Sequence, residues 1–393
     1  MTARALVLID GEHYAPVVRD ALAGLPYEVV GALLVGGTEK LRGVEEYGVP
    51  LVEALDAVEA DLVVDLSDEP VLGPRERFLW ASRTLALGLP YVGADFRFDP
   101  PPFHPVGTPS LAVIGLGKRI GKTAVAGHAA RLLARDRRVV VVAMGRGGPA
   151  EPELVEAPPT LEDLLALSRS GRHAASDHLE AATLAGVPAI GCRRAGGGLA
   201  GAPFESNVLE GVAIARELEP ELLVFDGSGA ALPPVETDAR ILVANGGHDP
   251  RAGLNAYRVL VSDLVVDTGG TDREAIRSIS DVPVVAAELR LRSTEPLRGR
   301  RTAVFTTGPA PVDELDAEVV HVSRNLARRD LLREELERVD AEVYLVELKA
   351  AAVDVVAEAA LARGAEVVLA ANDVVSDELD ERVLALVPDR SRA

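Results

Sequence analysis

The sequence predicts an α/β protein in three layers, with mostly parallel sheets between helices. Short runs rich in Val, Ile and Leu recur along the 393 residues and lack polar alternation, as in strands buried on both faces. Amphipathic segments separate many of these runs, which is typical of parallel strands joined by right-handed crossovers. The predicted strands are residues 5–9, 29–35, 61–66, 110–115, 139–144, 221–225, 240–244, 263–266, 302–306, 341–346 and 366–370, and the predicted helices include residues 125–135, 206–217, 327–339 and 353–363.

Two changes in composition divide the chain into three predicted domains. Five prolines fall within residues 96–109, directly before a new strand, which is typical of a linker. A second, weaker boundary lies near residues 289–301, where charged residues become more frequent. We therefore expect a Rossmann-like N-terminal domain over residues 1–105 that binds substrate or forms a lid. A nucleotide-binding domain over residues 106–300 and a C-terminal α/β portion over residues 301–393, continuous with it or separate, would follow.

The overall composition argues against several classes of partner and site. The chain has 61 acidic and 41 basic residues, a formal net charge of −20, so we expect no binding to nucleic acid or to anionic membranes. The single cysteine, Cys192, excludes an internal disulfide and a cysteine-based zinc site, and fits the cytoplasm. No apolar stretch approaches the ~18 residues of a membrane span. Only four basic residues are lysines, so each lysine is expected to serve a specific chemistry.

The strongest motif is a glycine-rich loop with the sequence Gly-Leu-Gly-Lys-Arg-Ile-Gly-Lys-Thr at residues 115–123. It follows an apolar strand and opens a helix, the context that a phosphate-binding loop requires. Backbone amides and the helix N-terminus would cradle phosphate, Lys122 would reach the β- and γ-phosphates, and Thr123 would hold Mg²⁺. The predicted nucleotide-binding residues are Gly115, Gly117, Gly121, Lys122, Thr123 and Ala124. The first glycine comes one residue earlier than in the standard motif, and this longer loop resembles that of dethiobiotin synthetase and its relatives, the deviant phosphate-loop NTPases.

A metal-binding carboxylate is predicted at the end of another strand. Asp226 follows the apolar run 222–225 and precedes Gly227, as the acidic partner of a phosphate loop does. An ordinary cap at the end of a strand is the alternative reading. We therefore predict Thr123 and Asp226 as the Mg²⁺ ligands.

Arginines beside glycines indicate a second anion. Arg146 follows the predicted strand 139–144, and Arg193 and Arg194 follow another apolar run. Ligands of open α/β sheets bind at the carboxyl ends of strands, and arginine suits phosphate and carboxylate. Solvated surface arginines are the alternative. The predicted catalytic residues are Lys118, Arg119, Lys122, Arg146 and Asp226.

Other polar residues near predicted strand ends are candidates for binding the same substrate. In the N-terminal part they follow three strands and could face one cleft, although turns and helix caps explain them almost as well. The histidine pair His173 and His178 could transfer protons or cap a helix. The predicted substrate-binding residues are Asp10, Glu12, His13, Lys40, Asp68, Arg146, His178, Arg193, Arg194 and Lys349.

Several longer strings extend these motifs over nearly the whole chain. They are residues 8–14, 36–41, 65–70, 117–124, 143–149, 173–178, 191–194 and 347–354. Together they resemble the cyclic 2,3-diphosphoglycerate synthetase family. The resemblance implies closure of 2,3-diphosphoglycerate into a cyclic compound, a compatible solute of thermophilic methanogens, with conversion of ATP to ADP and phosphate. It also implies Mg²⁺, with K⁺ as a further candidate cofactor, and a cytoplasmic homodimer.

The implied reaction agrees with the abundance of cations. Transfer of the γ-phosphoryl group would activate one substrate phosphate, and the other would then attack within the molecule. We expect Lys122, Thr123 and Asp226 to serve ATP, and the cations Lys118, Arg119, Arg146, Arg193 and Arg194 to hold the substrate or the transferring phosphate. The alternatives are a nucleotide-hydrolysing regulatory GTPase or ATPase, a kinase or ligase for another small phosphorylated acid, and a binding module without catalysis. The sequence lacks an Asn-Lys-x-Asp guanine motif, which favours ATP over GTP.

Overall fold

The computed structural model describes residues 2–43, 45–69, 71–171, 176–308, 311–348 and 352–387. The chain forms two compact units, each described by itself. Unit 1 contains residues 1–102, 248–262 and 272–282, and unit 2 contains residues 103–247, 263–271 and 283–393. In the described part of the chain, no helix is both long and apolar enough to cross a membrane.

Unit 1 is built on a six-stranded sheet in the order β3-β2-β1-β4-β5-β6, parallel except for the β5–β6 pair. Its strands are β1 (Arg4–Asp10), β2 (Glu28–Gly36), β3 (Leu51–Val52), β4 (Leu62–Asp65), β5 (Tyr91–Val92) and β6 (Arg97–Phe98). The central strand β1 is buried over Ala5–Asp10, as expected of a parallel strand covered on both faces. The helices α1 (Ala15–Gly24) and α2 (Pro74–Ala86) each begin with a proline in the first turn, where no amide hydrogen is needed.

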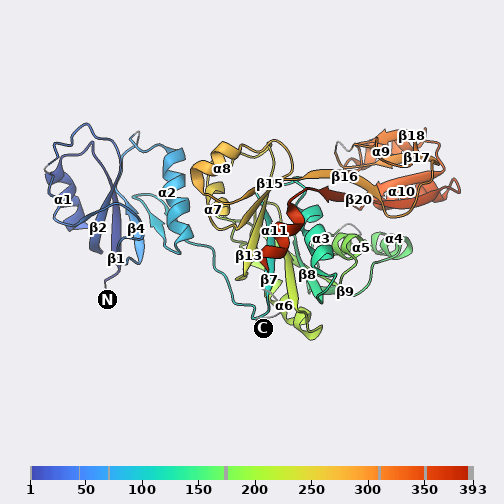
Figure 1. Ribbon diagram of the computed structural model, residues 1–393, viewed down its shortest axis with the longest axis horizontal. Coiled ribbons are helices and arrows are strands. Elements are labelled where there is room, and N and C mark those ends of the chain that lie inside the picture. The colour runs from blue at the N-terminus through green and yellow to red at the C-terminus, as the bar shows by residue number, and fades with distance from the viewer. Residues whose placement is uncertain are drawn as a thin grey trace. The chain divides into compact units, whose positions relative to one another are not determined.

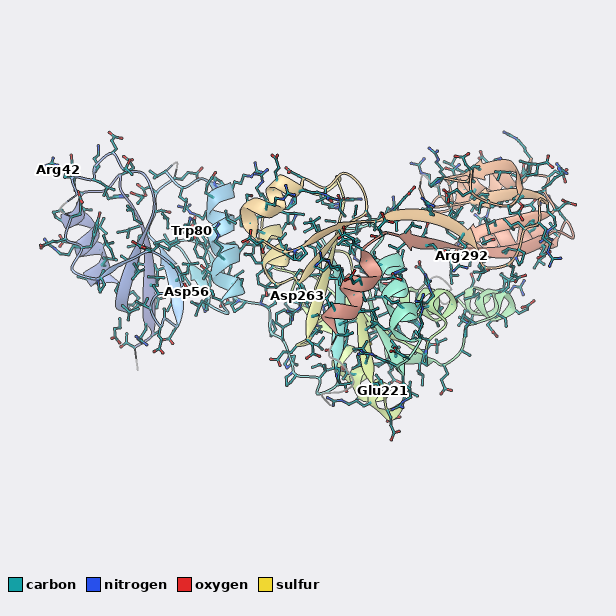
Figure 2. The ribbon with its side chains drawn as sticks, viewed as in Figure 1. Arg42, Asp56, Trp80, Glu221, Asp263 and Arg292 are labelled. Carbon is teal, nitrogen blue, oxygen red and sulfur yellow. The ribbon has the colours of Figure 1, made fainter. Side chains whose placement is uncertain are left out.

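Two helices from the middle of the sequence complete unit 1. They are α7 (Asn255–Leu260) and α8 (Arg273–Ile279); α7 packs on α2 and α8 packs on α7 (Figure 1). Arg75 of α2 forms an ion pair with Asp249 at 2.8 Å, which holds the added segment to the N-terminal part. The sole tryptophan, Trp80, lies on α2 (Figure 2).

Unit 2 contains a nine-stranded sheet in the order β11-β10-β8-β12-β7-β13-β14-β15, with β9 paired to β10. Its strands are β7 (Ser110–Gly115), β8 (Val139–Gly145), β9 (Glu153–Val155), β10 (Ala189–Ala195), β11 (Glu205–Ser206), β12 (Leu222–Asp226), β13 (Ala239–Ala244), β14 (Leu264–Asp267) and β15 (Val284–Ala286). All pairs are parallel except those of β9 and β11 with β10. The helices are α3 (Lys122–Leu133), α4 (Leu161–Arg169), α5 (Asp177–Ala185), α6 (Val208–Glu217) and α11 (Leu379–Leu386).

The same unit carries a smaller, five-stranded sheet in the order β16-β20-β19-β17-β18. Its elements are β16 (Glu288–Ser293), β17 (Arg301–Phe305), β18 (Glu318–Ser323), β19 (Val343–Glu347) and β20 (Glu366–Val375), with helices α9 (Arg329–Leu336) and α10 (Val353–Leu361). The antiparallel strands β16 and β20 run side by side and carry the chain between the two sheets (Figure 1). After β20, α11 packs against α3 and places Leu379 and Val383 in the core beneath the large sheet.

The predicted α/β class with mostly parallel sheets around a phosphate-loop core is confirmed. β7, β8 and β12 are buried over their whole length, as their unbroken apolar runs indicated.

Candidate active site

The phosphate-binding loop joins β7 to α3 at the carboxyl edge of the nine-stranded sheet. α3 begins at Lys122, directly after Gly121, whose φ of +83° is easily adopted only by glycine. A Cβ at this position would lie 2.5 Å from Cδ1 of Leu289, so the loop also needs glycine for close packing. Gly115 ends β7, and Ala124 is buried in the first turn of α3. The loop therefore presents the N-terminus of a three-turn helix, a group suited to phosphate.

Lys122 and Asp226 form a buried ion pair at the base of this loop. Asp226 ends β12, the strand next to β7, and its Oδ1 accepts a hydrogen bond from Nζ of Lys122. Oδ2 of Asp226 is also buried and has no hydrogen-bond partner among the described residues. Leaving a buried carboxylate oxygen unpaired is costly, so the site fits a bound cation that would complete it. Thr123 and Asp226 are the predicted residues that would hold Mg²⁺ here.

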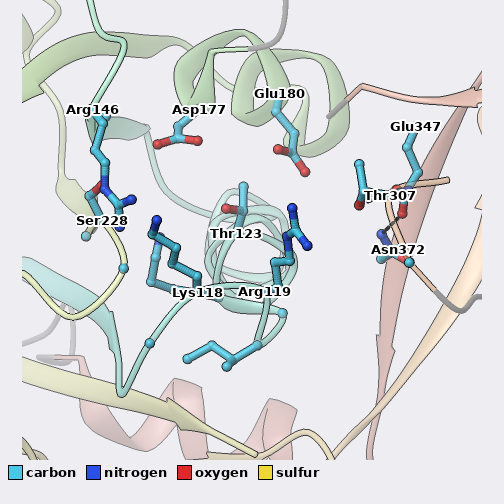
Figure 3. Close-up of a pocket in the computed structure, with 18 of the residues that line it drawn as sticks. Lys118, Arg119, Thr123, Arg146, Asp177, Glu180, Ser228, Thr307, Glu347 and Asn372 are labelled. Carbon is cyan, nitrogen blue, oxygen red and sulfur yellow. Dashed lines mark hydrogen bonds between the residues drawn. The ribbon is translucent and has the colours of Figure 1, made fainter. Parts of the chain in front are cut away.

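A cavity of about 790 Å³ opens above the loop and lies entirely within unit 2. Its walls come from the phosphate loop, the ends of β8 and β12, the start of α5 and the five-stranded sheet. Figure 3 shows three groups of side chains around it. Arg146 and Ser228 lie at one end near Lys118, Asp177 and Glu180 extend toward Thr123, and Thr307, Glu347 and Asn372 lie at the other end.

Three cations at the cavity have no acidic partner among the described residues. Lys118, Arg119 and Arg146 are exposed cavity residues, and within the described ranges none of them lies in ion-pair distance of a carboxylate. Unpaired cations that meet at a helix N-terminus attract a multiply charged anion. The sequence prediction placed these residues together, and they do line one cavity.

Arg194 is held close to this group from β10. Its Nη2 donates to the Ser228 carbonyl oxygen at 2.9 Å, and its Nη1 donates to that of Gly196 at 2.5 Å. Burial and the nearby Arg146 guanidinium lower the pKa of Arg194. Arg193 is exposed, and its Nη2 lies 3.9 Å from Oε1 of Glu205. Arg194 thus adds positive charge beside Arg146, and Arg193 points to another partner.

Two carboxylates of α5, which the sequence analysis did not assign to the site, face the phosphate loop. Asp177 opens α5, and Glu180 is buried one turn later. Both line the cavity and extend toward Thr123 (Figure 3). No three described His, Cys, Asp or Glu side chains are grouped to bind a metal by themselves. A metal at this loop would therefore depend on nucleotide oxygens for part of its coordination, as Mg²⁺ commonly does.

The five-stranded sheet closes the other end of the cavity. Thr307 follows β17, Glu347 ends β19 and Asn372 belongs to β20. The sequence analysis missed all three residues. It singled out the Glu-Leu-Lys string but chose Lys349, which lies outside the described residues, as does His173.

The N-terminal candidates gather at the carboxyl edge of the unit 1 sheet, around Asp10. Oδ1 of Asp10 accepts from the Glu12 amide at 3.0 Å and from Nδ1 of His13 at 2.8 Å, and Oδ2 accepts from the Asp68 amide at 2.8 Å. Nε2 of His13 lies 3.3 Å from Oδ2 of Asp68, and Nζ of Lys40 lies 3.3 Å from Oε1 of Glu39. These groups largely satisfy one another, and their assignment to substrate stays a prediction.

Hydrogen bonds and nearby charges explain the directions in which the pKa values of Asp10 and His13 shift. Burial alone would raise the pKa of Asp10, but the Asp68 and Glu12 amides and His13 lower it below its ordinary value. The hydrogen bond to Asp10 and the charges of Asp10 and Asp68 raise the pKa of His13, although burial opposes this. The pair therefore favours an imidazolium between two carboxylates.

His178 occupies a different place from the other candidates. It is buried, its ring packs on Gly191, and it lines a separate cavity of about 180 Å³ beside the main one. Its predicted contact with substrate is untested by this arrangement.

Comparison with known proteins identifies the family. Models of the cyclic 2,3-diphosphoglycerate synthetase N-terminal, P-loop and C-terminal domains match residues 4–99, 110–285 and 294–373. The synthetase of Rubrobacter xylanophilus is 48% identical, over 98% of this chain and 97% of that protein. Those of Thermococcus kodakarensis and Methanothermus fervidus are 41% and 36% identical, over 94% and 98% of this chain and 94% and 97% of their own.

Among solved structures, LpxK from Aquifex aeolicus in complex with ATP aligns with 73% of this chain and 91% of its own. Its identity of 16% and TM-score of 0.44 are too low to support an argument. The sequence relatives cover almost the full chain, and the resemblance seen in the sequence is confirmed. The chain belongs to the cyclic 2,3-diphosphoglycerate synthetase family.

Proposed function

We propose that this protein converts 2,3-diphosphoglycerate to cyclic 2,3-diphosphoglycerate and uses ATP, which it releases as ADP and phosphate. The observation that carries the proposal is a set of cations, Lys118, Arg119 and Arg146, that line the cavity at the N-terminus of α3 and have no acidic partner among the residues that the structure describes. A nucleotide alone needs the loop and its lysine. The additional cations suit a second, highly charged phosphate compound, and the relatives are named for the cyclic product of such a compound.

The loop and its two neighbours would bind ATP. Lys122 would leave Asp226 to contact the β- and γ-phosphates, and the amides of the α3 N-terminus would hold phosphate oxygens. Thr123 and Asp226 would hold Mg²⁺, with Asp177 and Glu180 close by. A bound Mg²⁺ supplies neutralisation of phosphate charge. A role for K⁺ is part of the same proposal.

The cations Lys118, Arg119, Arg146 and Arg194 would bind the substrate and align its two phosphates. An oxygen of one substrate phosphate would attack the γ-phosphorus of ATP, forming a phosphoanhydride and releasing ADP. An oxygen of the other substrate phosphate would then attack the inner phosphorus of that anhydride, and inorganic phosphate would leave. Lys118, Arg119, Arg146 and Arg194 would neutralise the charge that accumulates, and Arg193 would guide the substrate. Because the second attack is intramolecular, alignment replaces much of the entropic barrier.

A direct test combines product analysis with a paired variant. Purified protein with Mg-ATP and 2,3-diphosphoglycerate should give the ³¹P signals of a cyclic phosphoanhydride, together with ADP and phosphate. Lys122→Ala should abolish turnover, whereas Arg135→Ala, beyond the far end of the same helix, should leave turnover unchanged. ADP without a cyclic product would indicate a kinase or an ATPase, and full turnover by Lys122→Ala would refute the assignment of the loop.

The setting of the reaction belongs to the same proposal. We expect a cytoplasmic homodimer that acts on this small molecule and binds no nucleic acid. The net charge of −20 argues against nucleic-acid binding, and the single cysteine fits the cytoplasm. The family resemblance supports the dimer. Light scattering after size-exclusion chromatography should give twice the chain mass of 41.3 kDa.

A further inference from the structure

The end of the cavity formed by the five-stranded sheet carries an acid that no cation of the described residues neutralises. Glu347 is 6% exposed and lines the cavity at the end of β19. Its Oε2 accepts from the amide of Thr307 at 2.8 Å and from the Thr307 hydroxyl at 3.0 Å, and its Oε1 accepts from the Asn372 amide at 3.1 Å. All three donors are neutral. Within the described ranges, no lysine or arginine lies in ion-pair distance of this carboxylate.

The place of Glu347 in the sheet is typical of a ligand site. The chain leaves β17 toward β18 on one side and leaves β19 toward β20 on the other. The crevice between β17 and β19 is therefore the point where the strand order reverses, and open α/β sheets bind ligands there. Thr307 and Glu347 stand on the two sides of this crevice.

Contacts of strands β16 and β20 connect this crevice to the phosphate loop. Leu289 of β16 packs on Gly121, and it pairs with Val374 of β20, two residues beyond Asn372. Arg292 of β16, labelled in Figure 2, forms an ion pair with Asp373 of β20 at 2.9 Å, which adds a link between the two strands. The Glu347 end thus lies across the loop from the end that holds Arg146 and Ser228 (Figure 3).

Charge decides which part of the reactants can occupy each end. The triphosphate of ATP and all three acidic groups of 2,3-diphosphoglycerate are anionic, and a buried carboxylate with only neutral partners repels them. The nucleoside is the uncharged part of the reactants, and its ribose offers two adjacent hydroxyl donors. Oε2 of Glu347 already accepts two hydrogen bonds, but Oε1 accepts only one and can accept another. A strand-end carboxylate binds a ribose hydroxyl in other α/β folds.

From this charge separation we infer that Glu347, oriented by Thr307 and Asn372, binds a ribose hydroxyl of ATP. The five-stranded sheet then recognises the nucleoside, and the triphosphate runs along the loop toward Arg146. This inference rests on the proposed use of ATP. It assigns to the C-terminal part of the chain a role in nucleotide selection.

The test measures nucleotide binding to the full chain by calorimetry, with Mg²⁺ and without 2,3-diphosphoglycerate. The unaltered protein should bind ATP about tenfold or more tightly than 2′,3′-dideoxyATP, because a hydrogen bond to a charged carboxylate is lost. Glu347→Gln should weaken ATP binding and leave dideoxyATP binding nearly unchanged, so that the ratio falls toward one. Glu318→Gln, at the opposite, amino end of β18, should keep the full ratio.

Three results would overturn the inference. The unaltered protein could bind both nucleotides equally, or Glu347→Gln could weaken both by the same factor, as a structural or cation-binding role would require. Retention of the full ratio by Glu347→Gln would also refute it. Failure to bind any nucleotide would refute the proposed function, whereas good binding without cyclisation would refute only the proposed reaction.

Discussion

Two sheets of this molecule carry charged residues at the carboxyl ends of their parallel strands, but they differ in whether the cations there contact carboxylates. At the edge of unit 1, His13 lies between Asp10 and Asp68, Lys40 pairs with Glu39, and Nε of Arg77 lies 2.8 Å from Oδ2 of Asp65. At the phosphate-loop edge of unit 2, Lys118, Arg119 and Arg146 have no acidic partner in the described part of the chain.

The difference separates residues that organise a loop from residues that await a ligand. A cation that already contacts a carboxylate gives little further attraction to phosphate, whereas adjacent unpaired cations repel each other until an anion arrives. Burial lowers the pKa of Arg194, and repulsion from the Arg146 guanidinium adds to that shift. Strand-end position alone therefore does not identify a binding group, and the partner of each charge does.

The largest expected effect is the loss of an unpaired cation. Arg146→Ala should lower kcat/KM for 2,3-diphosphoglycerate about 100-fold, or about 2.7 kcal/mol, because a phosphate contact is lost in the transition state. It should not lower the midpoint of thermal unfolding, since Arg146 has no hydrogen-bond or ion-pair partner within the described ranges. Steady-state kinetics and calorimetric melting check the two parts, with Arg135→Ala as the control. A destabilised variant would show that Arg146 supports the fold.

The paired edge should respond in the opposite way. Asp10→Asn removes one acceptor from a buried group that serves two backbone amides and His13, and it should destabilise unit 1 by about 2 kcal/mol. The fluorescence of Trp80, the sole tryptophan, reports urea unfolding of unit 1 specifically. Arg146→Ala should leave that transition in place. An unchanged midpoint in Asp10→Asn would remove the contrast between the edges.

A third change tests the ion pair beneath the phosphate loop. Asp226→Asn should reduce the Mg²⁺ enhancement of ADP affinity about tenfold, or about 1.4 kcal/mol, because the buried Oδ2 is the predicted metal contact. Calorimetry with and without Mg²⁺ measures this enhancement directly, independently of turnover. Asp238→Asn, at the amino end of the sheet, is the control. If the Mg²⁺ enhancement persists in Asp226→Asn, the metal is held by other groups, and Asp177 and Glu180 line the same cavity.

The sequence predicted well those structural features that depend on residues close together in the chain. The buried strands show as unbroken apolar runs, and the phosphate loop needs only a strand, its glycines and a helix in succession. The predicted helix 206–217 differs from α6 by two residues at its start. The short strands β3, β5, β6, β9, β11 and β15 were not predicted because two or three residues carry no period. The six-residue strands β16 and β18 were also missed, since polar residues interrupt their apolar ones.

Features that depend on distant partners could not be predicted. α7 and α8 lie between strands of unit 2 in the sequence, but the packing of α7 on α2 adds them to unit 1. Glu347 reads as a strand end, and only the approach of Thr307 and Asn372 shows that it is buried with neutral donors. His13 was predicted as a ligand from its position, and the distant carboxylate of Asp68 beside it became evident only in three dimensions.

The smallest expected effect is a pH dependence of the stability of unit 1, which tests the contrast between the two sheet edges. The folded-state pKa of His13 is raised, mainly by its hydrogen bond to Asp10, so its stabilising contribution is complete below the ordinary histidine pKa of about 6.5. The contribution disappears as the pH rises through the higher folded-state value. His13→Gln should therefore destabilise unit 1 at pH 5.5, less so at pH 9, and always by less than Asp10→Asn.

Urea unfolding followed by Trp80 fluorescence at these two pH values measures the difference. The range stays above the ordinary and lowered pKa of Asp10, so that carboxylate remains charged throughout. His104→Gln, outside unit 1, should show no such trend. A penalty for His13→Gln that grows with pH would mean that the neutral imidazole is the stabilising form. The imidazolium would then add little to the stability of unit 1 and could bind a phosphate. In that case the two sheet edges would resemble each other in carrying a cation that is available to an anion.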